Sequence, residues 1–108
     1  MSDTDKDSQD PNRWELRDSI ADSQFELVRA GEVLSWVRYR QLAPNRYFLL
    51  HTEVVHSRRG NGIGKATVEA VLQELRGRQA KVTAICPFVS GYLTRNARYD
   101  DLLDLTRP

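Results

Sequence analysis

The stretch HTEVVHSRRGNGIGKATVEAVLQELRG, residues 51–77, contains two hydrophobic patterns joined by a glycine-rich turn. Its first residues end a run of apolar and β-branched residues at 47–55, which is typical of a strand. Glycines then gather within residues 58–64. The apolar residues that follow have the spacing i, i+3, i+4, i+7: Val68, Val71, Leu72 and Leu75. This spacing predicts an amphipathic helix over about 64–76, with Gly77 as its C-terminal stop.

Before this stretch the sequence is rich in strand signals. Residues 25–28 and 33–40 are mostly apolar, β-branched or aromatic, and Gly31 lies in the short turn between them. Residues 43–46, Ala-Pro-Asn-Arg, form a second turn before the strand at 47–55. Connections of hairpin length join antiparallel neighbours, so these segments predict an antiparallel meander.

Side chains of a strand alternate between its two faces. In the strand at 47–55, strict alternation gives one face with Phe48, Leu50, Thr52 and Val54. It gives the other face Leu49, His51, Glu53 and Val55. By the same rule, Leu34 shares a face with Trp36 in the preceding strand.

After the amphipathic helix, residues 81–86 form a short strand that ends before Pro87, and proline is favoured in the first turn of a helix. The next helix continues to about Asn96, and a last short helix holds Leu102 and its neighbours. A strand–helix–strand crossover makes its strands parallel, so residues 81–86 should lie parallel to residues 47–55. The predicted fold class is α/β (α+β): one mixed sheet with a meander, a strand–loop–helix–strand unit and a C-terminal helix.

The glycine-rich turn indicates an anion site, because glycines let the backbone approach an anion and the first free N–H groups of a helix point at it. A Walker loop is excluded, since Arg59 and Ala66 stand where it requires Gly and Ser/Thr. A dinucleotide fingerprint is excluded, since Lys65 or Thr67 stands where its third glycine belongs. The remaining pattern is Arg-x-x-Gly-x-Gly at residues 59–64. Three cations lie in or beside this loop: Arg58, Arg59 and Lys65.

Three motifs follow one another along the chain: HTEV (51–54), RRGNGIG (58–64) and CPFV (86–89), with Tyr92 shortly after the last. In this order and spacing they resemble the small single-domain branch of the GCN5-related N-acetyltransferases. The resemblance covers residues 14–103 and depends on the three motifs together. It implies an acetyltransferase-like domain that binds acetyl-coenzyme A, with the pyrophosphate on the glycine loop.

The resemblance implies that the glycine loop and the strand end before it bind the coenzyme. The residues expected to bind it are Val54, Val55, Arg58, Arg59, Gly60, Asn61, Gly62, Ile63, Gly64, Lys65 and Asn96. Val54 and Val55 would act through backbone groups, while their side chains suit an ordinary core. Two positions depart from the family pattern: His56 replaces a usual proline, and Asn61 replaces a residue that is often basic.

Four residues are candidates for the chemistry: Cys86, His51, Tyr92 and Glu53. Cys86 precedes Pro87 and can take the N-cap of a helix, where the dipole favours a thiolate near the acetyl group. His51 is a base or orienting partner for Cys86 or the amine, Glu53 a base acting through water, and Tyr92 a donor to the departing thiolate. Each also has a structural reading: a buried core thiol, a satisfied sheet histidine, an exposed edge charge and a core aromatic.

The implied activity is transfer of an acetyl group from the thioester of acetyl-coenzyme A to an amine. The acceptor is a protein lysine, a polypeptide N-terminus or a small amine, and a lysine must first lose a proton because its pKa is about 10.4. The alternative is a non-catalytic module that binds or senses acyl-coenzyme A, since a chain this small has few surfaces left for an acceptor pocket. No metal is expected, and the protein is expected to be a monomer or a weak homodimer.

Composition narrows the remaining classes. The chain has 108 residues, with 16 Lys+Arg against 15 Asp+Glu and a net charge of +1, which argues against nucleic acid as a partner. One cysteine excludes an intramolecular disulfide, and no apolar run reaches the ~18 residues that cross a membrane. These features predict a cytoplasmic location. Residues 1–12 hold four Asp, one Lys and a single apolar residue, which predicts a disordered acidic tail before a domain at 13–108.

Overall fold

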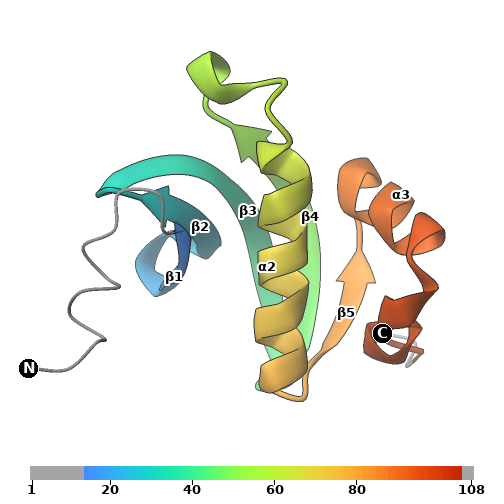
Figure 1. Cartoon of the computed structure of the whole chain (residues 1–108). Coiled ribbons are helices and arrows are strands. Elements are labelled where there is room, and N and C mark those ends of the chain that lie inside the picture. Colours follow the sequence, from blue (N-terminus) through green and yellow to red (C-terminus); the bar gives the residue numbers. More distant parts are fainter. Residues whose placement is uncertain (1–13, 106–108) are drawn as a thin grey trace, which may run out of the picture.

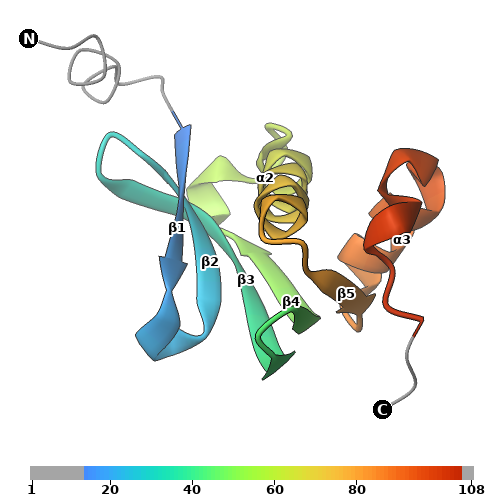
Figure 2. The ribbon, with the colours of Figure 1, turned by 90° about the horizontal axis from the view of Figure 1, so that it is seen from below.

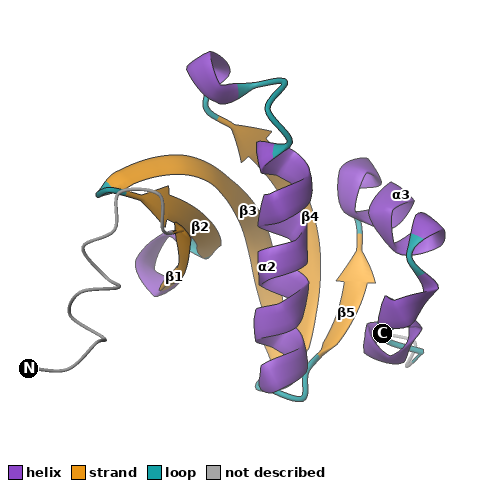
Figure 3. Cartoon of the chain, in the orientation of Figure 1, coloured by secondary structure: helices purple, strands orange, loops and turns teal. Residues whose placement is uncertain are grey.

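The five strands lie side by side in chain order, from β1 at one edge of a single sheet to β5 at the other (Figure 1). This computed structural model describes residues 14–105, so the predicted tail at 1–12 lies outside the described residues. The strands are β1 (Trp14–Ser19), β2 (Gln24–Arg29), β3 (Glu32–Ala43), β4 (Arg46–Val54) and β5 (Lys81–Ala84). The α-helices are α2 (Ile63–Gly77) and α3 (Pro87–Arg95). The short 3-10 helices are η1 (Ile20–Asp22), η2 (His56–Arg58) and η3 (Ala97–Leu102), and Figure 3 separates helices from strands by colour.

The pairing of the strands confirms the predicted mixed sheet. Strands β1 to β4 are antiparallel neighbours, and β5 runs parallel to β4 because α2 carries the chain back across the sheet. The sequence patterns do not predict β1. Its sequence WELRDS has only two apolar residues, Trp14 and Leu16, and no residue of this edge strand is buried. Leu16 packs against the core.

Both α-helices lie on the same face of the sheet (Figure 2). The predicted apolar stripe of α2 is confirmed, since its four members are fully buried: Val68, Val71, Leu72 and Leu75. They join one core cluster with Leu49 of β4 and with Val89 and Leu93 of α3. The sheet and the two helices therefore share the larger core cluster on this side, and a smaller cluster of Leu27, Leu34 and Ile63 lies beside the start of α2.

A β-bulge in β4 changes which side chains face the helices. Strand β3 pairs with Leu49 and with His51 through adjacent residues, and Leu50 between them has no partner. One extra residue reverses the alternation of side chains. Thr52 and Val54 therefore lie on the helix-covered face with Leu49, while His51 lies on the opposite face. The face assignment from strict alternation is wrong beyond Leu50 for this reason.

A second bulge has the same effect in β3. Strand β2 pairs with Val33 and with Ser35 through adjacent residues and leaves Leu34 unpaired. Leu34 is buried with Ile63 of α2, whereas Trp36 is half-buried and on the opposite face. The expectation that Leu34 and Trp36 share a face is therefore wrong.

The C-terminal end of α2 also differs from the prediction. Gly77 belongs to the helix, and the chain leaves it through Gln79, whose φ of 57° is left-handed. The N–H of Ala80 donates to the carbonyl of Leu75, and that of Gln79 donates to the carbonyl of Arg76, at 2.9 and 3.0 Å. This pair of bonds usually places glycine where Gln79 lies, so the predicted stop at Gly77 is wrong by two residues.

Candidate functional site

A pocket of about 410 Å³ opens between the end of β4, the glycine loop and the start of α3. Its lining combines four segments: Thr52 and Val54 of β4, Arg59, Gly60 and Gly62 of the loop, Ile63, Gly64 and Lys65 of α2, and Phe88 of α3. Figure 1 shows β4 continuing past the tip of β5 before the chain turns over into α2. The pocket therefore gathers most of the residues that the sequence predicts to bind a coenzyme.

The backbone of the glycine loop explains its composition. Gly60 and Gly62 have φ of 87° and 73°, in the left-handed region that other residues rarely adopt. Gly62 is the N-cap of α2, and its carbonyl accepts the first helical bond, from the N–H of Ala66, at 3.1 Å. The N–H groups of residues 63–65 have no carbonyl to bond within the helix. With the positive end of the helix dipole they make this wall of the pocket favourable for an anion.

Gly64 is required for a different reason: the start of α3 leaves little space for a side chain at this position. A Cβ at Gly64 would lie 3.1 Å from Cζ of Phe88 and 3.6 Å from Cγ2 of Val54. Carbon atoms pack best at about 3.5–4.0 Å, so a side chain here would push against the phenyl ring. Gly64 therefore sets the distance between the start of α2 and the start of α3, and with it the width of the pocket.

The two parallel strands separate beside this pocket. The ladder between β4 and β5 ends at the pair Leu49 and Ala84, and the carbonyl of Leu49 accepts the N–H groups of Ile85 and Cys86 at 2.9 and 3.0 Å. Beyond this point β4 continues to Val54 with no strand partner on its β5 side among residues 14–105. Unpaired backbone groups at a strand edge bind ligands well, so this edge continues the polar surface of the glycine loop.

Cys86 is the N-cap of α3 and Pro87 is its first residue, which confirms the local prediction. Cys86 is 3% exposed and belongs to the core cluster. Its Sγ lies 3.4 Å from Oγ1 of Thr52. Thr52 also lines the pocket, so it is the residue that connects the thiol to the pocket. Alternation along β4 assigns Thr52 to the wrong face, and this is why the sequence does not identify it.

His51 and Glu53 form a pair of their own on the opposite face of β4. His51 Nε2 lies 2.7 Å from Oε1 of Glu53, and Arg59 lies 3.7 Å from Oε2 of the same carboxylate. The side chains of His51 and Glu53 are 57% and 36% exposed. The structure thus brings His51 to Glu53, whereas the thiol of Cys86 contacts Thr52. Arg59 connects this pair to the pocket, because Arg59 lines the pocket as well.

Tyr92 and Asn96 lie away from the pocket lining. The hydroxyl of Tyr92 donates to Oε2 of Glu69 on α2 at 2.7 Å and accepts from Arg98 at 3.4 Å. Burial and the hydrogen bond to Glu69 raise the pKa of Tyr92 above its ordinary value. Asn96 caps α3, and its Nδ2 donates to the carbonyl of Tyr92 at 2.7 Å. Both side chains have structural partners here.

The remaining predicted residues lie around the rim of the site. The N–H of Val55 donates to the carbonyl of Leu34 at 2.9 Å, so Val55 continues the pairing of the sheet. Asn61 is exposed between the two left-handed glycines. The backbone of Arg58 ends η2, next to Arg59. The side chains of Arg59 and Lys65 line the pocket.

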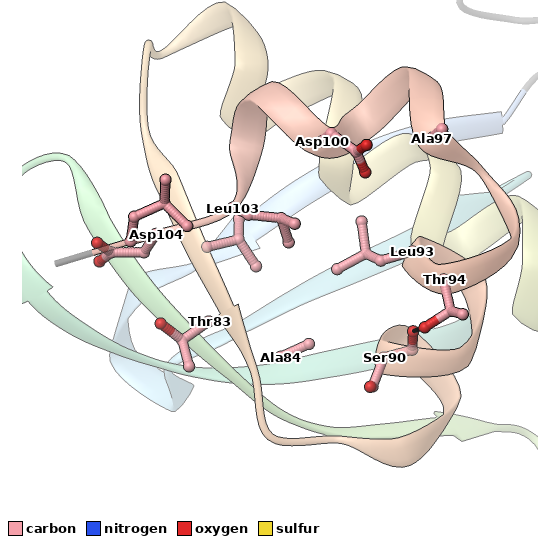
Figure 4. Close-up of a pocket in the computed structure, with 11 residues that line it drawn as sticks. Thr83, Ala84, Ser90, Leu93, Thr94, Ala97, Asp100, Leu103 and Asp104 are labelled. Atoms are coloured by element: carbon pink, nitrogen blue, oxygen red, sulfur yellow. Dashed lines mark hydrogen bonds between the residues drawn. The ribbon is translucent and has the colours of Figure 1, made fainter. Parts of the chain in front are cut away.

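A second pocket of about 440 Å³ lies between β5, α3 and η3 (Figure 4). Asp100 and Asp104 lie on its wall, and Oγ1 of Thr94 donates to the carbonyl of Ser90 at 3.0 Å. No residue predicted from the sequence lines it. Because carboxylates repel phosphate groups, this pocket does not suit a polyphosphate.

Residues 14–105 contain no grouping of His, Cys, Asp and Glu that could hold a metal ion. No helix within the same residues is long and apolar enough to cross a membrane.

Fold and site together define an α/β domain in which a glycine loop opens a helix at the end of a separating pair of parallel strands. Residues 24–102 match the family model described as GCN5-related N-acetyl-transferase. This span is about three quarters of the chain and contains the whole pocket. The chain therefore belongs to the GCN5-related N-acetyltransferase family, a family of acetyltransferases that use acetyl-coenzyme A as cosubstrate.

Solved structures show the same fold. The solution structure of a GCN5-like protein from Staphylococcus aureus has a TM-score of 0.62 and 24% identity, over 86% of this chain and 90% of that chain. The crystal structure of ribosomal-protein-alanine N-acetyltransferase from Brucella melitensis biovar Abortus 2308 has a TM-score of 0.50 and 19% identity, over 79% and 63%. No curated protein sequence matches the chain. The likeness to these structures confirms the predicted fold class.

Proposed function

We propose that this protein binds acetyl-coenzyme A in the pocket between β4, α2 and α3 and transfers the acetyl group to an amine. The observation that carries the proposal is the junction of two features: the free N–H groups at the start of α2 and the unpaired edge of β4 line one pocket. An anion site suits the pyrophosphate, and a strand edge suits the amide groups of pantetheine.

The phosphates would lie on the loop. Backbone groups of residues 60–64 surround the anion site, and Arg59 and Lys65 add two positive charges at its wall. A cationic wall and a helix N-terminus act in the same direction on a phosphate. Asn96 is not part of this proposal, because it caps α3 through Tyr92.

The acetyl group would lie where β4 and β5 separate, beside Thr52 and Val54. The amine nitrogen forms a bond to the acetyl carbonyl carbon, the carbon–sulfur bond breaks, and coenzyme A leaves as a thiolate that takes up a proton. The proton of the amine passes to the exposed pair of His51 and Glu53, which lies on the other face of the same strand. In this route Cys86 shapes the pocket through Thr52, because its thiol is buried.

Thermal unfolding with coenzyme A tests the binding step. A ligand at a hundred times its Kd stabilises the native state by about 2.7 kcal/mol, which raises the Tm of a domain of this size by about 10 °C or more. Gly62→Val forces a β-branched residue into a left-handed conformation and should abolish the shift. Gly77→Ala, at the far end of α2 with open space around its Cβ, is the matched control and should keep it. No shift in the parent protein at millimolar coenzyme A contradicts the proposal.

Release of free coenzyme A thiol in the presence of amines tests the transfer step. Turnover that survives in Cys86→Ala supports direct attack by the amine. A mass increase of about 42 Da on the protein, absent in Cys86→Ala, indicates a covalent acetyl-cysteine route instead. Binding of coenzyme A without turnover by any amine supports the alternative, a non-catalytic binding or sensing module; the separation of Tyr92 from the pocket favours that alternative.

A further inference from the structure

One face of the sheet carries no helix among the described residues. Both α2 and α3 pack on the other face (Figure 2). The uncovered face presents Trp36, Arg38 and Arg40 of β3. Their cross-strand partners on β4 are Glu53, His51 and Phe48. Cross-strand partners share a face, so these six side chains form one continuous surface next to the point where β4 and β5 separate.

This surface is positive because of two arginines. Arg38 and Arg40 are exposed and have no hydrogen-bond or ion-pair partner among residues 14–105. The acidic groups nearby are already bound. Glu26 accepts from Arg17 and Gln24, with a shortest distance of 2.7 Å to each. The guanidinium groups of Arg38 and Arg40 are therefore available to bind an anionic partner.

The carboxylate of Glu53 is likewise occupied, by His51 at 2.7 Å and by Arg59 at 3.7 Å. The gap between the strands opens at the same level of the sheet. Leu50 and Ile85 flank the last pair of the ladder and are 39% and 54% exposed. An alkyl chain that carries an amine can pack against these two apolar side chains on its way to the thioester. The surface thus combines cations with an apolar entrance.

We propose that this face binds the acceptor, and that the acceptor is an acidic polypeptide segment whose amine enters the gap between β4 and β5. The proposal rests on the proposed function and specifies its acceptor class. In an extended segment, side chains on one face repeat about every 6.6–6.8 Å, which is also the spacing of Arg38 and Arg40. Carboxylates at alternate residues therefore match the two arginines one to one.

A polynucleotide fits this surface less well. It carries a continuous row of phosphates, and the carboxylates of Glu26 and Glu53 flank Trp36 on either side, next to Arg38. The chain as a whole has a net charge of only +1. Spaced carboxylates can avoid these two acidic residues, whereas a dense row of phosphates meets them.

The test uses two peptides that carry both a free N-terminus and one lysine. One has glutamates at alternate positions around the amine, and the other has glutamines there. The acidic peptide should have a kcat/KM at least about fivefold higher, through a lower KM, and the preference should shrink in 0.5 M salt. Arg38→Glu should remove the preference. Arg95→Glu, which makes the same change in net charge at the exposed end of α3, should keep it.

A binding measurement tests the acceptor-binding surface independently of the proposed acetyl transfer. The chain has two tryptophans, so Trp36 is the sole reporter in a Trp14→Phe background. Titration of the acidic peptide should change the fluorescence of Trp36, and Arg38→Glu should abolish the change without altering the affinity for coenzyme A.

The possible results distinguish a failure of the acceptor surface from a failure of the transferase function. A fluorescence response without turnover supports the surface and contradicts the transferase function. Turnover with equal use of both peptides, or an Arg38→Glu effect that is the same for both, overturns the surface and leaves the function. A single-stranded polynucleotide that binds Trp36 more tightly than the acidic peptide at equal salt also overturns it.

Discussion

The two halves of β4, before and after Leu50, differ in burial and in strand pairing. Before Leu50, Tyr47 and Leu49 are 3% and 0% exposed, and the strand is paired on both sides. After Leu50, His51 and Glu53 are exposed, and within residues 14–105 the strand is paired only with β3. One unpaired residue thus separates a half that stabilises the fold from a half that is open to a ligand.

This difference shows how a small domain can hold a binding site at little cost in stability. The larger core cluster lies under the paired half, whereas Val54 of the open half packs against the smaller cluster of Leu27, Leu34 and Ile63. The open half keeps its pairing with β3 and leaves its other edge for a substrate, so the backbone groups on its β3 side remain satisfied. Substitutions on either side of Leu50 test whether stability and binding are divided at this residue.

The largest effect is expected in the paired half. Leu49→Ala removes a fully buried side chain from the core and should lower the free energy of unfolding by about 3 kcal/mol. Urea unfolding measures this. In the open half, Val54→Ala should lower it by only about 1 kcal/mol, because Val54 is half-buried. Equal losses would show that the core extends past the bulge.

In the open half, Gly64→Ala should act on the ligand. The new Cβ meets the ring of Phe88 at 3.1 Å and narrows the pocket, so the Kd for coenzyme A should rise about tenfold. Stability should change by less than about 1 kcal/mol, since alanine favours the helix by that amount and the contact opposes it. Calorimetric titration measures the Kd.

The control is the double variant with Phe88→Leu, which replaces the ring and should restore much of the affinity. If the Kd of the single variant is unchanged, Gly64 does not set the width of the pocket. If the double variant remains weak, the loss comes from the helix start and not from the contact with Phe88.

Much of this architecture follows from local sequence patterns. The i, i+3, i+4, i+7 spacing identifies α2, the order of elements gives the parallel pair, and Cys86-Pro87 gives the start of α3. The glycine loop is recognisable because its residue types are constrained by backbone geometry at Gly60 and Gly62. These features depend on neighbours in the sequence, so the sequence reveals them.

The features that escape prediction depend on residues far apart in the chain. A bulge at Leu50 is visible only in the pairing with β3, so Thr52 is assigned to the wrong face and its contact with Cys86 is missed. Tyr92 meets Glu69, 23 residues away on another helix. Alternation and motif spacing carry no information about such partners.

Tyr92→Phe tests whether the hydroxyl of Tyr92 contributes to stability and not to catalysis. Since the hydroxyl is bonded to Glu69 and lies outside the pocket lining, kcat for acetyl transfer should stay within about twofold, a change below about 0.5 kcal/mol. Stability at pH 7 should fall by about 1 kcal/mol, the worth of one hydrogen bond. A fall in kcat of more than about tenfold would restore the catalytic role that the family resemblance implies for this tyrosine.

The pH dependence of the free energy of unfolding of the same variant tests the contribution of the Tyr92 hydroxyl to stability. The pKa of Tyr92 is raised in the folded state, so its neutral hydroxyl contributes stability that is fully present below the unfolded pKa of about 10. That contribution is lost as pH rises through the folded pKa. Above pH 10 the wild type should therefore lose stability more steeply than Tyr92→Phe. Parallel curves from urea unfolding would show that the hydroxyl is not held in its neutral form.

The smallest effect is expected at the far end of α2. Gln79 has a left-handed φ of 57° without being glycine, so Gln79→Gly should raise the free energy of unfolding by about 0.5–1 kcal/mol. The Kd for coenzyme A should not change. Gly62 has the same kind of backbone conformation at the opposite end of α2, where it faces the pocket.

Gly62→Gln is therefore the reverse of the substitution Gln79→Gly, made at the opposite end of α2. It should lower stability by a comparable amount and also weaken coenzyme A binding, because a strained loop no longer holds its N–H groups toward the anion. Thermal unfolding with and without coenzyme A measures both quantities for both variants. If Gln79→Gly also alters the affinity, the two ends of α2 are coupled, and the separation of stability from binding does not extend beyond β4.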